Sequence, residues 1–82
     1  MIAAEQIRAA RAMLKWSAKD LADRSGLSLA TIQRMEAARG VPTSSARNVE
    51  IVQHTLEDAG IEFIEEERGR RGPGLRLSRP IR

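Results

Sequence analysis

Hydrophobic residues near the start of the chain recur with the period of a helix. Ile7, Ala10 and Leu14 are separated by three and four residues and lie among strong helix formers. This pattern predicts a helix over about residues 4–15. Trp16 comes directly after that helix and is expected to pack over the join to the next one.

Two short helical segments follow in the stretch SAKDLADRSGLSLATIQRME. Ser17 and Asp20 have the spacing of a capping box, in which each side chain accepts a hydrogen bond from a backbone amide at the start of a helix. Gly26 can adopt the left-handed conformation that ends such a helix, and Ser28 is a candidate N-cap for the next one. The pattern therefore predicts two helices that meet at a tight corner.

The second half of the chain continues the helical period and then changes to alternation. Gly40 and Pro42 interrupt the helices, and an apolar stripe beyond them predicts a helix over residues 45–59, which Gly60 ends. Apolar and polar residues then alternate in part over IEFIEE and cleanly over GLRLS. The segment ERGRRGPG between them has the composition of a loop. This predicts a β-hairpin, which must pack against the helices or a second subunit because an isolated hairpin is barely stable in water.

Composition restricts the class of protein. A chain of 82 residues, of which 41% are hydrophobic and 2% aromatic, predicts one domain with a modest aliphatic core. The absence of cysteine excludes disulfides and thiolate metal sites and fits a reducing compartment, so we expect a cytoplasmic protein. No apolar run is long enough to cross a membrane, and we expect no membrane association.

The distribution of charge says more than the net charge of +3. Residues 1–56 carry 8 Lys or Arg against 5 acids, residues 57–67 carry 6 acids and no base, and residues 68–82 carry 6 arginines and no acid. A mildly basic body with a basic end favours a polyanionic partner. The same distribution also fits a soluble surface with a solvated tail.

The corner between the two short helices has the spacing of a helix–turn–helix. Ala22 is small where the second helix must cross closely, Gly26 makes the turn, and Ile32 fills the gap between the helices. The DNA-binding kind of this unit uses its first helix to hold the second in a major groove.

Over QIRAARAMLKWSAKDLADRSGLSLATIQRMEAARGVPT the sequence resembles the Xre/Cro-type, phage-repressor-like helix-turn-helix regulators. The ending AGIEFIEE and GPGLRLS resembles short bacterial members that add a strand pair. The resemblance implies a mainly α fold, with a repressor-like DNA-binding domain of four or five helices and a C-terminal β-hairpin or strand pair. It also implies no cofactor and a symmetric dimer on a near-palindromic operator in double-stranded DNA.

The resemblance assigns a recognition helix to residues 28–37. Its candidate base contacts are Leu29, Ala30, Gln33 and Arg34. Arginine is frequent in the family where this chain has Leu29. A leucine cannot donate to a guanine edge but can contact thymine methyl groups, so Gln33 or Arg34 would supply the hydrogen bonds. The alternative is that both are ordinary solvated side chains.

Candidate phosphate contacts lie at helix starts and in the loop after the recognition helix, where exposed amides also attract anions. They are Ser17, Lys19, Ser28, Thr31, Arg39, Thr43 and Ser44. The family often has glutamine where this chain has Ala18, so Ser17 or Lys19 would have to make that contact. The resemblance also implies a partly buried ion pair between Arg11 and Glu36, the alternative being two unrelated surface charges.

Other chemistry finds little support in the sequence. His54 is the one histidine, which argues against a metal site, and there is no glycine-rich phosphate loop. The adjacent carboxylates of residues 65–67 are more typical of solubilising charge than of an acid–base pair. We therefore expect neither an enzyme nor a metal site.

The chain is expected to divide into a DNA-binding domain over residues 1–60, a hairpin over 61–78 that joins two subunits, and a loose tail over 79–82. The basic end could instead be a wholly solvated tail, or an arm that grips the DNA backbone. The residues expected at the dimer interface are Val49, Val52, Ile61, Phe63, Leu75 and Leu77.

These features predict a homodimeric transcriptional regulator, a repressor or autoregulator of the phage or mobile-element kind. The alternative is a protein-interaction module with the same fold, an antitoxin or antiactivator whose partner binds the C-terminal extension. The acidic run over residues 62–67 keeps this alternative open, because it would repel DNA if it lay at the groove.

Overall fold

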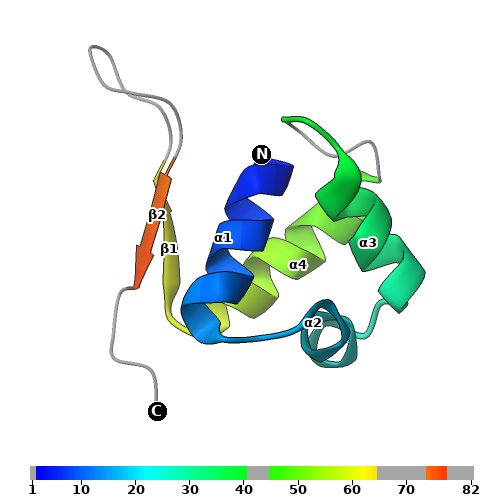
Figure 1. Ribbon diagram of the computed structural model, residues 1–82, viewed down its shortest axis with the longest axis horizontal. Helices are drawn as coiled ribbons and strands as arrows, with labels where there is room; N and C mark the ends of the chain where they lie inside the picture. The colour runs from blue at the N-terminus through cyan, green and yellow to red at the C-terminus, as the bar shows by residue number, and fades with distance from the viewer. Residues whose placement is uncertain (1, 41–44, 65–73, 78–82) are drawn as a thin grey trace.

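A computed structural model describes residues 2–40, 45–64 and 74–77. These form four helices and one two-stranded antiparallel sheet (Figure 1). The elements are α1 (Ala4–Leu14), α2 (Ala18–Ser25), α3 (Leu29–Ala37), α4 (Ala46–Asp58), β1 (Ile61–Ile64) and β2 (Gly74–Leu77). The predicted mainly α fold with a C-terminal strand pair is confirmed. Thr43, Ser44, the loop over 65–73 and the tail over 79–82 lie outside the described residues.

The predicted capping residues set the ends of the short helices. The Asp20 backbone amide donates to Ser17 Oγ at 3.0 Å, and the Ser17 amide donates to Asp20 Oδ2 at 2.9 Å, which completes a capping box at the start of α2. Ser28 Oγ accepts from the Thr31 amide at 3.1 Å and caps α3. Helix α1 ends one residue before the predicted bound because Lys15 adopts a left-handed conformation, with φ of 60°.

One aliphatic core joins the four helices and the first strand. It is built by side chains from every helix, from β1 and from the residues before α1, namely Ile2, Ile7, Ala10, Leu14, Leu21, Ala22, Ile32, Met35, Val49, Val52, Leu56 and Ile61. Half-buried Trp16 packs against it beside the join of α1 and α2.

Three residues expected at a dimer interface belong instead to this internal core. The side chains of Val49 and Val52 are 0% exposed and that of Ile61 is 2% exposed within a single chain. The prediction of Val49, Val52 and Ile61 as contact residues was therefore wrong, because a second subunit cannot reach them.

The sheet lies at the opposite end of the molecule from α3, with α1 and α4 between them (Figure 1). Its register pairs Ile61 with Leu77 and Phe63 with Leu75. Paired residues of an antiparallel ladder lie on the same face, so these four positions share the face on which Ile61 enters the core. Phe63 is half-buried against that core, whereas the side chains of residues 75 and 77 are not among those described.

Candidate nucleic-acid interface

The corner between α2 and α3 has the geometry that its spacing predicts. Gly26 has φ of 77°, and its amide donates to the Ala22 carbonyl at 3.0 Å, so the chain turns directly after α2. Ala22 is 4% exposed and Ile32 is fully buried. The small side chain and the buried isoleucine let the two helices pack closely, which fixes the direction of α3 relative to the rest of the core.

An arginine from α1 holds the far end of α3. Arg11 Nε and Nη2 donate to the two carboxylate oxygens of Glu36, each at 2.7 Å, and Nη1 donates to the Trp16 carbonyl at 3.0 Å. The side chains are 22% and 9% exposed, respectively, so the ion pair is largely screened from water. The hydrogen bonds to Glu36 raise the pKa of Arg11, which stays charged. One guanidinium therefore ties α1, α3 and the α1–α2 join together.

Hydrogen bonds at two further places, the end of α3 and Gly40 after it, hold this part of the chain, and none was predicted from the sequence. Arg8 Nη1 donates to the Glu36 carbonyl. Glu5 accepts from the Gly40 amide at 3.1 Å, and the Ala4 amide donates to the Gly40 carbonyl at 2.8 Å. All are contacts to backbone atoms, and such contacts leave no residue-type pattern by which they could be recognised in advance.

The face of α3 that points away from the core is exposed along its whole length. Its exposed residues are Leu29, Ala30, Gln33, Arg34 and Ala37, and its buried residues are Ile32, Met35 and Glu36. The polar groups of Gln33 and Arg34 make no hydrogen bond or ion pair with any residue that the structure describes. All four predicted base-contacting side chains thus lie together on one open surface.

The predicted phosphate contacts are only partly brought together. Ser17, Ser28 and Thr31 lie at the starts of α2 and α3, where Ser28 Oγ and Thr31 Oγ1 are also 2.9 Å apart. Lys19 pairs with Asp23 at 3.1 Å, but both side chains are well exposed, so water or a phosphate can compete for the lysine. Arg39 is exposed after α3, and the predicted contacts at 43 and 44 fall outside the described residues.

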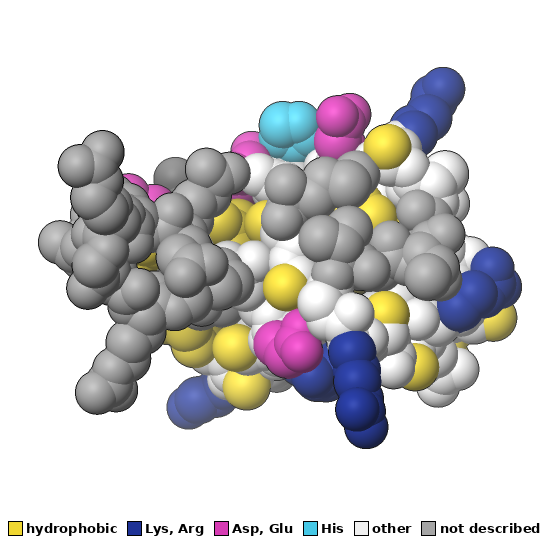
Figure 2. Space-filling view, turned by 90° about the horizontal axis from the view of Figure 1, so that it is seen from above, with side chains coloured by type: hydrophobic (Ala, Val, Ile, Leu, Met, Phe, Trp, Pro, Cys, Tyr) yellow, Lys and Arg dark blue, Asp and Glu magenta, His cyan; other side chains and the backbone are white. Residues whose placement is uncertain are grey.

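Lys and Arg side chains of the described residues stand apart from one another on one face of the helical part (Figure 2). On the face shown in Figure 2, Lys and Arg side chains project from the margin of the helical part, and acidic side chains lie beside some of them.

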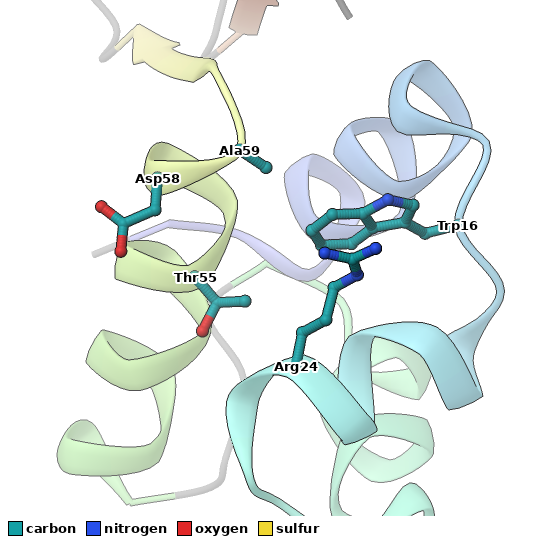
Figure 3. Close-up of a pocket in the computed structure, with 5 residues that line it drawn as sticks. All are labelled: Trp16, Arg24, Thr55, Asp58 and Ala59. Carbon is teal, nitrogen blue, oxygen red and sulfur yellow. The ribbon is translucent and has the colours of Figure 1, made fainter. Parts of the chain in front are cut away.

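A hollow of about 310 Å³ lies away from α3, where the α1–α2 join meets the end of α4. Trp16, Arg24, Thr55, Asp58 and Ala59 line it, and the Arg24 guanidinium carbon stacks 4.3 Å from the centre of the Trp16 ring (Figure 3). This cation–π contact covers the indole at the edge of the core. The hollow does not include the outward face of α3.

Within residues 2–40, 45–64 and 74–77, no group of three or more His, Cys, Asp or Glu side chains is arranged to hold a metal ion. His54 Nδ1 instead lies 3.3 Å from Glu57 on α4. No helix among these residues is long and apolar enough to cross a bilayer.

Residues 7–46, which run from within α1 through the corner and α3 to the start of α4, match the model of a helix-turn-helix family. These residues form a helix-turn-helix domain of that family. Its members of the Xre/Cro type bind DNA, and the protein is accordingly a DNA-binding transcription regulator. The family is a DNA-binding regulatory one and not a family of enzymes. The chain matches no curated protein.

Proposed function

We propose that this helix-turn-helix protein is a homodimeric repressor or autoregulator that inserts one α3 helix per subunit into adjacent major grooves of a near-palindromic operator. The observation that carries the proposal is the outward face of α3, where Gln33 and Arg34 are exposed and have no partner among the described residues. A helix fixed at both ends, with unpaired polar groups facing outward, is suited to reading base edges.

The place of the hairpin supports a particular dimer. Because α3 and the sheet lie at opposite ends of the molecule, two copies can stand side by side with both α3 helices facing the same DNA and both hairpins away from it (Figure 1). The molecule measures 37 × 32 × 18 Å along its principal axes. Two copies that stand side by side across the 32 Å dimension would hold their α3 helices about that far apart. This separation is close to the roughly 34 Å of one turn of DNA.

In this dimer the contact would involve the hairpin, where Phe63 and Ile64 on β1 are the described apolar residues that are only half-buried. The acidic strand residue Glu62 would stand far from the phosphates. That position weakens the objection that the acidic segment repels DNA. It also leaves the hairpin accessible to a protein partner, as an antitoxin-type function would require.

A mobility-shift assay against DNA upstream of the protein's own coding sequence tests the proposal. We expect a shift with a two-fold symmetric footprint, and a dimer in sedimentation analysis. Arg34→Ala should weaken binding to the shifted site by about 1–3 kcal/mol, or about fivefold to 150-fold, because it removes a base contact. The thermal unfolding midpoint should stay unchanged, since Arg34 is exposed and makes no described contact.

Two results would contradict the proposal. If Arg34→Ala binds the operator as tightly as the wild type, the base-contact assignment is wrong. If no DNA is shifted while a protein encoded nearby binds tightly to the chain, the antitoxin-type interaction module is the better description.

A further inference from the structure

The surface of α3 carries an unusual apolar residue. Among the described residues, Leu29 is the large hydrophobic side chain classed as exposed, at 39% of its surface, whereas the core aliphatics are 0–6% exposed. It is the first residue of α3 and follows the Ser28 cap directly. Contact between this leucine and an apolar group of a bound partner would be favourable, because it removes apolar surface from water.

Gln33 lies directly beside this leucine. Residues four apart on a helix are neighbours on one face, so Leu29, Gln33 and Ala37 form one row along the exposed side of α3. The amide of Gln33 has no hydrogen-bond partner in the described part of the chain. Row neighbours of this kind can contact the same base pair or adjacent base pairs in a groove.

The short side chains nearby permit a close approach. Ala30 and Ala37 are both exposed on the outward face and project little beyond the helix backbone. A helix with alanines at these positions can lie deep in the major groove, which brings the carboxamide of Gln33 within hydrogen-bond reach of base edges. Long side chains at the same positions would hold the helix away from the groove floor.

The chemistry of these two side chains selects one kind of base pair. A carboxamide presents one donor and one acceptor side by side, which matches N7 and the N6 amino group of adenine, whereas guanine presents two acceptors. The apolar group that the major groove offers to a leucine is the C5 methyl of thymine. Donor, acceptor and apolar contact are therefore all satisfied by A·T pairs.

We propose that α3 recognises adjacent A·T pairs, with Gln33 bonded to an adenine and Leu29 packed on the methyl group of a neighbouring thymine. This inference rests on the proposed DNA-binding function and names the sequence that the same surface reads. Leu29 and Gln33 are then specificity-determining residues beside Arg34, and neither is needed for the fold, because both side chains face away from the core.

Selection of binding sites from a pool of randomised duplexes tests this assignment. The full-length wild type, Gln33→Ala and Leu29→Ala are each used for selection. We expect the wild type to select half-sites with adjacent A·T pairs, and Gln33→Ala to lose its preference for adenine at one position by about fivefold to 150-fold. Leu29→Ala should lose its preference for thymine at the neighbouring position.

Base analogues in the selected site then test each atom. Uracil in place of the contacted thymine removes only the methyl group and should weaken wild-type binding about fourfold, the value of one buried methyl. The same replacement should not change the binding of Leu29→Ala. 7-Deazaadenine at the contacted adenine should weaken the wild type but not Gln33→Ala.

The possible failures can be told apart. Selection of no duplex by the wild type contradicts the proposed function itself. Selection of sites in which Gln33→Ala changes a guanine preference, or changes no position, leaves the DNA-binding function standing and overturns the A·T assignment. An equal uracil effect in wild type and Leu29→Ala overturns the role of Leu29.

Discussion

At the scale of single residues, Arg11 makes the contacts on which the position of α3 most depends. Its guanidinium meets both oxygens of Glu36 and the Trp16 carbonyl, and it is mostly buried. Buried charges are costly when unpaired, so the pair specifies one orientation of α1 against α3 even if it adds little net stability. An altered angle between these helices would move the whole DNA-facing surface.

Replacement of Arg11 by methionine should therefore destabilise the protein. Arg11→Met keeps the aliphatic stem but leaves the carboxylate of Glu36 without its guanidinium, and we expect a loss of about 2–4 kcal/mol in the free energy of unfolding. Urea denaturation followed by circular dichroism measures this. The double variant Arg11→Met/Glu36→Leu should recover much of the loss, because no unpaired charge remains. Additive effects of the two substitutions would show that the pair is not coupled.

At the scale of elements, the capping box of α2 makes stability depend on pH. The hydrogen bond from the Ser17 backbone amide, followed by the contact with the Ser17 hydroxyl, lowers the pKa of Asp20 from its ordinary value. A carboxylate with a lowered folded pKa stabilises the protein above its unfolded pKa, about 3.9, and this contribution is lost as pH falls through the folded pKa.

Asp20→Asn mimics the protonated side chain and tests this effect. The variant should be less stable than the wild type at pH 7, and the difference should shrink as pH falls below about 4, because wild-type Asp20 then loses its charge as well. Urea denaturation at a series of pH values measures the difference. Asp23→Asn removes a charge from the same helix without touching the capping box, and the exposed pair with Lys19 that it also breaks contributes little to stability, so it serves as the charge control. A difference that is constant from pH 7 to acid would contradict the prediction.

The helices could be predicted from sequence because their signals are local. Ser17, Gly26 and Ser28 act on residues within one turn, and the structure places a helix end at each of them. The exact end of α1 could not be predicted, because Lys15 adopts a left-handed conformation that glycine more often supplies.

The sequence predicts that certain apolar side chains are buried more readily than it predicts which part of the protein covers them. An apolar stripe shows that Val49 and Val52 are covered but not whether the cover comes from the same chain or another. Because this small domain has few aromatic side chains, it needs nearly all its aliphatic residues for its own core, and Ile61 is buried in that core too. The contacts of Arg8 and Glu5 with backbone atoms were unpredictable for a related reason, since any residue presents such atoms.

At the scale of the whole molecule, the surface proposed for DNA and the element proposed for dimerisation occupy opposite ends (Figure 1). The rigid helical core between them would transmit the position of one to the other. In that arrangement a change at the hairpin alters the spacing of two α3 helices without changing what either helix reads. Affinity for a half-site and affinity for a full operator thus become separable quantities.

Salt dependence measures how many phosphates the dimer contacts. Each neutralised phosphate releases counterions, so the logarithm of the binding constant should fall linearly with the logarithm of salt concentration, with a slope of about −0.9 per contact. Lys19→Ala and Arg39→Ala each remove one candidate contact per subunit, and each should make the slope of a dimer less negative by about two. Both residues are exposed, so the fold should be unaffected.

Conservative variants provide the matched controls for this measurement. Lys19→Arg and Arg39→Lys keep the positive charge and should keep the wild-type slope even if affinity changes slightly, because counterion release depends on charge rather than on geometry. Fluorescence anisotropy at a series of KCl concentrations gives the slopes. If the alanine variants lower affinity but retain the wild-type slope, these side chains act through the structure of the protein and not through phosphates. A slope change of about one instead of two would show that only one subunit contacts the DNA backbone. That result would support the phosphate contact of the substituted residue but would contradict the symmetric dimer.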